Sequence, residues 1–398
     1  MNILIVSTGI LPQPAVKGGA VETLVDTLIK YNEKTMEHNI KIYTVYDEKA
    51  VSYYDKYKKC KFISVKINKM IRYLFNKGII PTRVILNIFT NKVAKDIKNI
   101  NDFDVVLLQN EFRYAKKIKK QIGSKPFILH LHNDYVNKEV KGIEKKIKIF
   151  NSVITVSNFL KQRIEEIDNS IEIKTIHNGI DLKKFKKIDG YQRKKIREKY
   201  GIKDDEIIIV FAGRLIKEKG IKELLLAFNQ IPREFKIKLL VVGNSFFNEN
   251  KENKFVKELK NIAKDNKNNI IFTGFIPYEK MNEIYSIADI GCVPSIWAEP
   301  FGLTVVEQMA MQLPMIVSNV GAIPEIVDKE CALIVNNNDE YILNLKNTII
   351  ELYYNETLRK KMGEISIKLS ENFSDIKFSD NIFKYLEEEY KRNTQTKN

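Results

Sequence analysis

The most specific feature of the sequence is Ile290-Gly-Cys-Val-Pro-Ser-Ile-Trp-Ala-Glu-Pro-Phe-Gly-Leu-Thr-Val-Val-Glu307. It opens with the short apolar run Ile290–Val293, which is typical of a buried parallel strand. Pro300 and Gly302 then break the chain, and the pattern predicts a helix from about Leu303. A strand, a loop and a helix in this order form the unit from which helix-covered parallel sheets are built.

The same alternation of short β-branched runs and longer amphipathic stretches continues along the chain. At 398 residues, of which 44% are hydrophobic, the chain exceeds what one core usually supports. We therefore expect an α/β domain over residues 1–187, a second over 188–375, and a C-terminal helix over 376–398 that returns toward the first domain and ends in a frayed tail. The predicted strands are Asn2–Ser7, Ile40–Val45, Phe103–Leu108, Phe127–Leu131, Ser152–Val156 and Glu172–Ile176, then Ile207–Ala212, Lys238–Val242, Ile270–Thr273, Ile290–Val293, Met315–Val317 and Ala332–Val335.

Charge is distributed unevenly between the two predicted domains. The whole net charge of +16 lies within residues 1–187, and the remainder is neutral. The first domain should therefore attract an anionic surface or substrate. Cys60, Cys292 and Cys331 are too scattered for a disulfide framework or a metal cluster, which fits a reducing, cytoplasmic setting. The first residues are interpreted as a strand rather than a signal peptide, and no apolar run reaches the about eighteen residues of a membrane span.

Two acids bracket the start of the helix predicted from Leu303. Backbone N–H groups of Gly302, Leu303 and Thr304 should point outward as a cradle for an anion, since ligands bind beyond the carboxyl ends of parallel strands. Glu299 and Glu307 would be unfavourable beside an anion unless they have another partner, and sugar hydroxyl groups are such a partner. Ordinary first-turn acids are the competing interpretation, but Glu299 precedes the cap and Glu307 lies beyond the first turn.

Phe211-Ala-Gly-Arg-Leu-Ile-Lys-Glu-Lys-Gly220 follows another predicted apolar strand. Arg214 and Lys219 are five residues apart on a turn that leads into a helix over Ile221–Asn229. A guanidinium fork and an ammonium group together suit a diphosphate, whose negative charge grows when it departs. Two solvated bases on a surface loop are the alternative. The two glutamates of the other segment favour the diphosphate site.

Taken together, the two segments resemble glycosyltransferase family four, the large retaining family with the GT-B fold. The resemblance covers nearly the whole chain, because Gly18-Gly19-Ala-Val-Glu22, Asn178-Gly-Ile-Asp181 with Phe185, and Gly321-x-x-Pro-Glu325 are also similar to its landmarks. It implies two Rossmann-like domains with parallel sheets facing across a central cleft, a nucleotide-diphosphate sugar donor, and neither a metal nor a cofactor. Ala322 departs from the second glycine that many members carry before the Pro-Glu pair.

The resemblance also implies roles for individual residues. Arg214 and Lys219 would hold the diphosphate, Glu299 would lie by the donor sugar and Glu307 would bind the ribose hydroxyl groups. The implied catalytic residues are His132, Glu299, Arg214 and Lys219; the implied donor-binding residues are Gly18, Gly19, Arg214, Lys219, Ile276, Glu299, Phe301, Gly302, Leu303 and Glu307.

Histidine is rare in this sequence, with four residues in all. In Leu129-His-Leu-His-Asn-Asp134, strand alternation should turn His130 and His132 to one face, with His132 protruding at the carboxyl end. His132 also matches the family's histidine that approaches the sugar and the acceptor, although a metal-binding pair is a competing interpretation. His38 is predicted to lie at the surface. Asp102-Phe-Asp104 resembles the metal site of another glycosyltransferase class, but it precedes a predicted strand rather than following one.

Other classes of protein fit less well. A dehydrogenase needs Gly-x-Gly-x-x-Gly after the first strand, and the segment Ser7–Gly19 lacks that pattern. Nucleic acid is not an expected partner, because the basic residues lack regularly interleaved aromatic side chains. A non-catalytic nucleotide-sugar-binding protein remains an alternative. The resemblance makes a UDP-sugar the default donor and a glycan or lipid-linked molecule of the bacterial cell or spore surface the expected acceptor.

The segment Lys66–Ile80 is basic and amphipathic. Drawn as a helix, it gathers Ile67, Met70, Ile71, Leu74 and Phe75 in one stripe and carries Lys66, Lys69, Arg72 and Lys77. It predicts either a surface helix packed on the core or a site that docks on the anionic inner face of a membrane.

Overall fold

The computed structural model of the chain describes residues 1–113, 115–244 and 253–395. The chain divides into two compact units. Unit 1 comprises Met1–Gly179 and Asp375–Asn398, and unit 2 comprises Ile180–Ser374. The first boundary thus precedes the predicted one at residues 187 and 188. Of the tail predicted to be frayed, residues 392–395 continue a helix and residues 396–398 lie outside the described residues.

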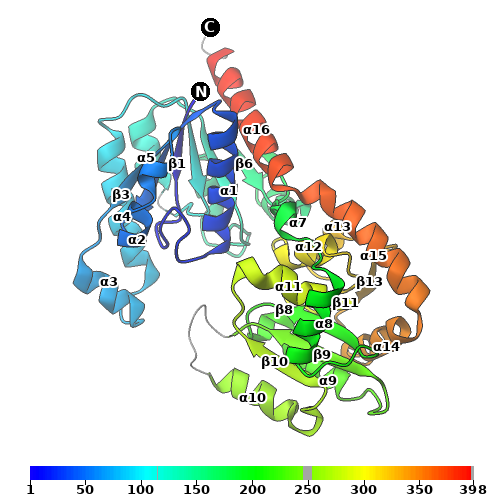
Figure 1. Cartoon of the computed structure of the whole chain (residues 1–398). Coiled ribbons are helices and arrows are strands. Elements are labelled where there is room, and N and C mark those ends of the chain that lie inside the picture. Colours follow the sequence, from blue (N-terminus) through cyan, green and yellow to red (C-terminus); the bar gives the residue numbers. More distant parts are fainter. Residues whose placement is uncertain (114, 245–252, 396–398) are drawn as a thin grey trace. The chain divides into compact units, whose positions relative to one another are not determined.

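Unit 1 is built on a parallel seven-stranded sheet in the order β3-β2-β1-β4-β5-β6-β7 (Figure 1). Helices α1 and α16 cover one face, and α4 and α5 lie on the other. The strands are β1 (Asn2–Val6), β2 (Asn39–Val45), β3 (Cys60–Val65), β4 (Val105–Gln109), β5 (Phe127–Leu131), β6 (Ser152–Thr155) and β7 (Glu172–Thr175). The helices are α1 (Ala20–Thr35), α2 (Glu48–Val51), α3 (Lys69–Asn76), α4 (Thr82–Ile97), α5 (Ala115–Ile122), α6 (Ile143–Ile147), α7 (Asn158–Glu165) and α16 (Asp375–Gln395).

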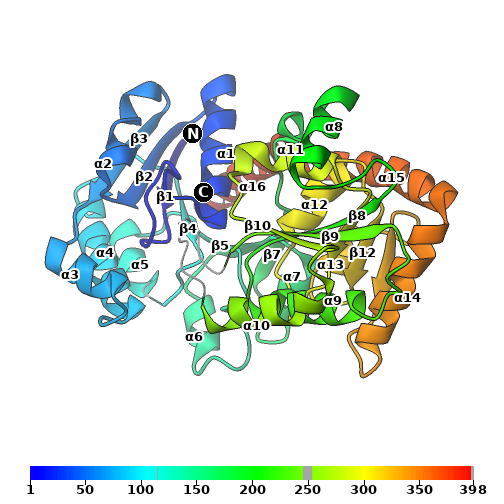
Figure 2. The same ribbon diagram turned by 60° about the horizontal axis from the view of Figure 1, so that its bottom comes forward.

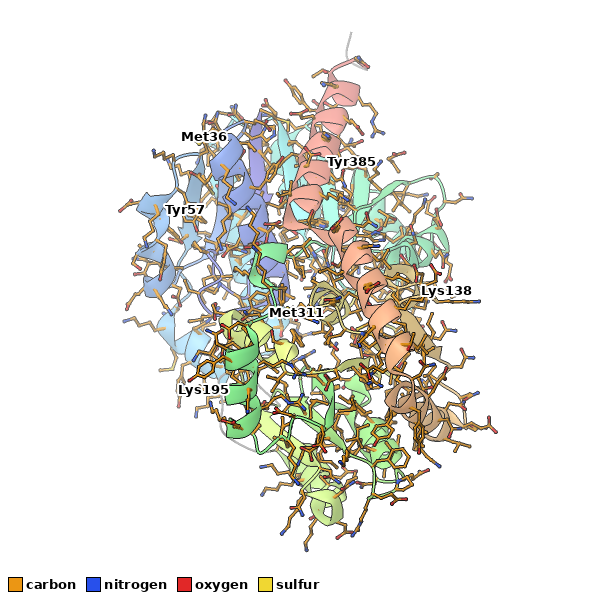
Figure 3. All side chains as sticks on the ribbon, turned by 45° about the vertical axis from the view of Figure 1, so that its right-hand side comes forward. Met36, Tyr57, Lys138, Lys195, Met311 and Tyr385 are labelled. Atoms are coloured by element: carbon orange, nitrogen blue, oxygen red, sulfur yellow. The ribbon has the colours of Figure 1, made fainter. Side chains whose placement is uncertain are left out.

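The C-terminal helix α16 is part of the core of unit 1. Phe378, Ile382 and Tyr385 pack with α1 and the strands, and Tyr385 is labelled on α16 in Figure 3. Each such fully buried apolar side chain contributes about 1.5–3 kcal/mol to stability. The expectation of a surface position for His38 is wrong: it is only 3% exposed, with its ring centroid 4.9 Å from that of Phe383. Its cover comes from α16, which is distant in the sequence.

Unit 2 is built on a parallel six-stranded sheet in the order β10-β9-β8-β11-β12-β13. Helices α9, α10 and α14 share a core on one face, and α12 packs on the other, against Gly291 (Figure 2). The strands are β8 (Ile207–Ala212), β9 (Ile237–Val242), β10 (Ile270–Gly274), β11 (Ile290–Val293), β12 (Met315–Ser318) and β13 (Ala332–Val335). The helices are α8 (Gly190–Lys199), α9 (Ile221–Phe228), α10 (Lys254–Ile262), α11 (Met281–Ser286), α12 (Leu303–Ala310), α13 (Ile323–Ile326), α14 (Tyr341–Tyr354) and α15 (Glu356–Ser370).

Each sheet has one point where the strand order reverses. In unit 2 the chain runs outward from β8 to β10 in one direction and from β11 to β13 in the other; in unit 1 the reversal falls between β1 and β4. Ligands of open parallel sheets bind outside the carboxyl ends of the strands at such points. The loops after β8, β11, β1 and β4 are therefore the ones that position a site. No helix within the described residues is long and apolar enough to cross a membrane.

Candidate functional site

The loops after β8 and β11 in unit 2 are joined to each other. The backbone N–H of Ile296 donates to the carbonyl of Glu218 at 3.0 Å. Gly220 has φ 65°, and a Cβ placed on it would lie 1.7 Å from the carbonyl oxygen of Pro294. The first loop can therefore rest directly on the second because residue 220 has no side chain.

This contact brings three side chains together: Lys219 and Glu299, which the sequence predicted as site residues, and Ser295, which it did not. Lys219, at the end of the 3-10 turn η3 (Lys217–Lys219), places its Nζ 2.6 Å from Oε1 of Glu299. Ser295 donates its hydroxyl to the same oxygen, also at 2.6 Å. Glu299 and Ser295 are only 4% and 1% exposed, whereas the Lys219 side chain is 23% exposed. Oε2 of Glu299 has no hydrogen-bond partner among the described residues.

The start of α12 follows directly after this cluster. Gly302 is its N-cap, with φ 115°, and no side chain in the described part of the chain caps the helix. Its first backbone N–H groups, including that of Leu303, are therefore available to an anion. Phe301 is buried against Phe373, with ring centroids 5.9 Å apart, so only its backbone can face the same anion.

The second predicted acid has a different partner. Tyr285 of α11 donates its hydroxyl to Oε2 of Glu307 at 2.8 Å, and both side chains are buried. Burial raises the pKa of Glu307 to about 7, although the hydrogen bond from Tyr285 acts in the opposite direction. Burial also raises the pKa of Tyr285 well above its ordinary value, and the neighbouring Glu307 adds to that rise.

The backbone of Glu299 is held by the Gly321–Glu325 segment. Ala322 donates its N–H to the carbonyl of Glu299 at 2.8 Å. A Cβ on Gly321, whose φ is 54°, would lie 2.4 Å from both the N and the O of Glu299. The alanine at position 322 keeps the donor N–H, so this departure from the family pattern leaves the contact intact. Glu325 lies half-buried on α13.

The remaining donor-side predictions fall on the neighbouring strand ends. Arg214 directly follows the loop glycine after β8; it is exposed and forms no ion pair within the described residues. A Cβ on Gly243, after β9, would lie 1.9 Å from the carbonyl oxygen of Gly213, so the backbone at these two strand ends is tightly packed. Ile276 is half-buried and lies just beyond β10.

In unit 1, Gly18 and Gly19 lead into α1. Gly19 is the N-cap, with φ 105°, and a Cβ on it would lie 2.3 Å from Oε2 of Glu22. Glu22 is buried and accepts a hydrogen bond from Thr8 at 2.6 Å. Burial raises the pKa of Glu22. The N-terminus of α1 therefore carries its own buried acid.

The predicted histidine lies at the carboxyl end of β5. His130 and His132 share one face, with ring centroids 4.0 Å apart, as strand alternation predicts. The expectation that His132 protrudes is wrong: it is 7% exposed, its Nε2 lies 2.7 Å from Oε1 of Gln109, and its backbone N–H donates to Asn110 at 2.8 Å. Residues that follow β4 thus cover it. Burial lowers the pKa of His132 to about 3, so its imidazole is neutral near pH 7.

The metal-site alternatives gain no geometric support. Asp104 accepts a hydrogen bond from the N–H of Asn2 at 2.7 Å, and Asp102 pairs with Lys41, as expected for a loop before a strand. Among the described residues, no group of three or more His, Cys, Asp or Glu side chains is placed to hold a metal ion.

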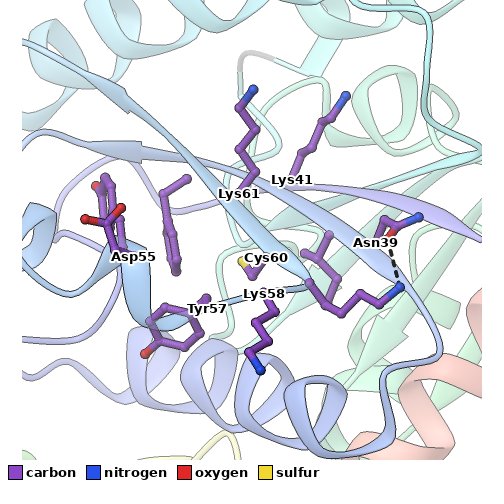
Figure 4. Close-up of a pocket in the computed structure, with 11 residues that line it drawn as sticks. Asn39, Lys41, Asp55, Tyr57, Lys58, Cys60 and Lys61 are labelled. Atoms are coloured by element: carbon purple, nitrogen blue, oxygen red, sulfur yellow. Dashed lines mark hydrogen bonds between the residues drawn. The ribbon is translucent and has the colours of Figure 1, made fainter.

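One pocket of unit 1 lies at the opposite, amino ends of β2 and β3 (Figure 4). Lys41 and Lys61 point the same way from paired strands there, and the side chain of Lys59 donates to Asn39 at 3.3 Å. This pocket contains none of the predicted site residues.

Two sequence families match the two units in turn. The model of the family described as "Glycosyl transferases group 1" matches residues 192–369, and that of "Glycosyltransferase Family 4" matches residues 18–184. Together the two models support a GT-B glycosyltransferase similar to family four. The family's two Rossmann-like folds are the two parallel-sheet units described above, and the family transfers sugars.

Individual relatives can be aligned with most of this chain. Spore coat protein SA of Bacillus subtilis is 25% identical over 398 residues, which covers 97% of this chain and 99% of the relative. The lipopolysaccharide 1,2-N-acetylglucosaminetransferase of Salmonella typhimurium is 27% identical over 272 residues, or 67% and 68% of the two chains. The structure of HepE of Anabaena in complex with UDP matches with a TM-score of 0.75 and 18% identity, covering 98% of this chain and all of that chain (100%).

Sequence reasoning missed Ser295, Tyr285 and Gln109, each of which holds a predicted residue. Ser295 could have been found, because it lies four residues before Glu299 in the same loop. Tyr285 and Gln109 have no local signal, since each reaches its partner from another element.

Proposed function

We propose that this glycosyltransferase moves a sugar from a UDP-sugar to a hydroxyl acceptor with retention of the anomeric configuration. The observation that carries the proposal is the contact between Lys219 and the buried Glu299 at the strand-order reversal of unit 2, beside the uncapped start of α12. A cation, the uncapped backbone N–H groups at the start of a helix and a carboxylate lie together there. This combination suits a diphosphate joined to a polyol.

The chemistry assigned to these groups is a front-side displacement without an enzymic nucleophile. The bond between the anomeric carbon and the diphosphate oxygen breaks, and the departing charge is taken up by Lys219, by Arg214 and by the start of α12. The acceptor oxygen forms its bond on the same face, and its proton passes to the departing phosphate oxygen. Glu299 orients a sugar hydroxyl and balances positive charge that grows on the ring.

His132, whose Nε2 is bound to Gln109, would exchange that contact for a hydroxyl group of the sugar or the acceptor and bind it as a neutral hydrogen-bonding group. Its pKa of about 3 excludes a charged imidazolium near neutral pH. A neutral partner suits an uncharged hydroxyl, which it can bind without ionising.

The acceptor is proposed to be a glycan or lipid-linked molecule of a cell or spore surface. The names of two relatives, a spore coat protein and a lipopolysaccharide sugar transferase, support this class. UDP is the proposed carrier because HepE, which shares the fold, is known in complex with UDP. A protein that binds the nucleotide sugar without turnover is the alternative.

A panel of nucleotide sugars tests the proposal. Donors that bind should raise the melting temperature by an amount set by their affinity and concentration. The best donor is then incubated with oligosaccharide acceptors, and the anomeric configuration of the product is determined by NMR. An inverted product contradicts the displacement mechanism, and donor binding without transfer or hydrolysis supports the non-catalytic alternative.

We also propose that unit 1 docks on an anionic membrane through α3. None of the residues of α3 is buried, and Met70, Tyr73 and Ile79 are 65%, 57% and 66% exposed. Lys69 and Lys77 lie exposed beside them. Arg72, which the sequence placed in the basic set, instead donates to the carbonyl of Ile10 at 2.9 Å and does not belong to the docking surface.

Sedimentation with vesicles tests this docking. Each lysine near an anionic surface contributes roughly 1 kcal/mol, so Lys69→Glu with Lys77→Glu should greatly reduce binding to anionic vesicles. Lys195→Glu with Lys361→Glu makes the same charge change at exposed positions of unit 2 and should not. Equal binding to neutral and anionic vesicles, or equal effects of the two double variants, contradicts the proposal.

A further inference from the structure

We propose that Ser295 is the positioning residue that keeps Glu299 in place while Lys219 is exchanged from Glu299 to the donor diphosphate. This inference rests on the donor site proposed above. It assigns a role to a residue outside the predicted site, and it makes the ion pair between Lys219 and Glu299 the resting state of the site.

The geometry divides the two carboxylate oxygens of Glu299. Lys219 and Ser295 both bind Oε1, each at 2.6 Å. Oε2 is left without a partner among the described residues, and it is the oxygen that can accept a sugar hydroxyl. Ser295 thus holds the carboxylate by the oxygen that Lys219 also binds, and it leaves Oε2 to a sugar hydroxyl.

The exposure of the three groups says which one can move. Glu299 and Ser295 are 4% and 1% exposed and lie in one loop, with Ser295 directly after Pro294. The Lys219 side chain is 23% exposed on a flexible stem, in the loop that also presents Arg214. Lys219 can therefore turn to a newly bound anion, whereas Glu299 remains in place.

Ser295 is needed to stabilise the charge of Glu299 once Lys219 has turned to the diphosphate. A carboxylate that loses its cation in a buried site is strongly destabilised unless another donor holds it. The hydroxyl of Ser295 is the donor that stays, and a hydrogen bond to an ionised oxygen is about twice as strong as a neutral one. Glu299 therefore stays oriented when the diphosphate takes Lys219.

The two variants should therefore differ in UDP binding although both lose turnover. Glu299 competes with the diphosphate for Lys219 and repels it, so Glu299→Gln should bind UDP about fivefold more tightly while turnover collapses. Ser295→Ala leaves Lys219 and the cradle intact, so UDP affinity should change less than about twofold while kcat falls tenfold or more. A residue that only supported the fold would not separate these two quantities.

The experiment measures UDP binding by calorimetry and kcat with the donor that the wild-type protein uses. Ser295→Thr, which keeps the hydroxyl, should restore most of the lost kcat. Ser370→Ala is the matched control: Ser370 is also a buried serine of unit 2, it donates to the carbonyl of Ile367 at 2.6 Å, and it lies outside the site. Melting temperatures of the two alanine variants separate loss of folding from loss of orientation.

The outcomes distinguish a failure of the role of Ser295 or Lys219 from a failure of the proposed donor. UDP affinity that is unchanged or weaker in Glu299→Gln overturns the exchange of Lys219. A normal kcat in Ser295→Ala, or a loss that Ser295→Thr does not repair, overturns the positioning role. A wild-type protein that binds no uridine nucleotide instead overturns the proposed donor, and this inference with it.

Discussion

The two units present different chemistry at the carboxyl ends of their strands. At the strand-order reversal of unit 2, Lys219 and Glu299 form an ion pair. At the carboxyl ends of β4 and β5 in unit 1, Gln109 and His132 form a buried pair in which the imidazole is neutral. Charged groups suit an anionic leaving group and neutral groups suit hydroxyls. The same fold therefore supports two roles through the residues that follow its strands.

The net charge of the two halves of the sequence does not follow the charge of their site groups. The first 187 residues carry all of the net charge of +16, yet the pair of Gln109 and His132 at the strand ends of unit 1 is neutral. The excess lysines lie on exposed positions such as Lys69 and Lys77 of α3. Net charge thus describes what the surface attracts, whereas the paired groups at the strand ends describe the chemistry.

The largest expected effect is at the charged site. Lys219→Ala removes the cation proposed to meet the growing charge of the leaving group. It should raise the activation free energy by about 3 kcal/mol and so lower kcat/KM roughly 150-fold. Arg214→Ala should have a similar effect. Lys217→Ala, in the same turn η3, is the control and should be nearly silent. Full activity of Lys219→Ala would remove the diphosphate role and the contrast between the units.

The next effect concerns the backbone that supports Glu299. Gly321→Ala should lower kcat about tenfold or more, because a Cβ there would lie 2.4 Å from the backbone of Glu299 and must displace it. Gly201→Ala is matched for backbone strain, with φ 64° and nothing within 4 Å of the added Cβ. Gly201→Ala should lose about 1–2 kcal/mol of stability from its left-handed backbone alone, and Gly321→Ala should lose at least as much. Equal kinetics in the two would show that Gly321 matters only for its backbone angle.

A smaller effect is expected at the neutral site. His132→Ala should lower kcat/KM by about 1 kcal/mol, or roughly fivefold, since one neutral hydrogen bond is lost. With a pKa of about 3, His132 does not ionise between pH 5 and 9. The ratio of wild-type to variant activity should therefore stay constant over that range. A ratio that changes near pH 6.5 would mean that the imidazole titrates during turnover.

The sequence predicted elements best where burial alone determines them. The predicted bounds of β5, β8, β11 and β13 agree with the structure, and among these runs of apolar residues only β5 is interrupted, by His130. Strand β3 (Cys60–Val65) was missed, because Lys61 and Ser64 interrupt its apolar residues within a lysine-rich stretch and the strand depends on pairing with β2.

Among the site residues, strand ends and helix starts could be placed from sequence, but partners from other elements could not. Tyr285, for example, lies far from Glu307 in the chain, and Gln109 covers His132 from a neighbouring strand. Local patterns carry no information on such contacts, which depend on how the elements pack.

The smallest expected effect concerns Glu307, and it tests whether this acid acts as a charged or as a neutral side chain. Burial raises the pKa of Glu307 to about 7, so it ionises near neutral pH, and Tyr285 stabilises the ionised form. A carboxylate accepts ribose hydroxyls better than a carboxylic acid does. The affinity for UDP, expressed as the ratio of wild type to Glu307→Gln, should rise less than tenfold as pH increases from about 6 to 8. This ratio cancels the titration of the phosphate itself.

Stability should change in the opposite direction. The folded-state pKa of Glu307 lies above its ordinary value of 4.5, so its contribution is fully present below pH 4.5 and is lost as pH rises through about 7. The melting temperature of wild type relative to Glu307→Gln should therefore fall over this range. Tyr285→Phe removes the bond that lowers the pKa and should move both transitions to higher pH. Tyr353→Phe, whose hydroxyl accepts from the N–H of Lys236, should move neither. If both transitions occur at the same pH in Tyr285→Phe as in the wild type, another group titrates, and Glu307 would count as a charged group at neutral pH.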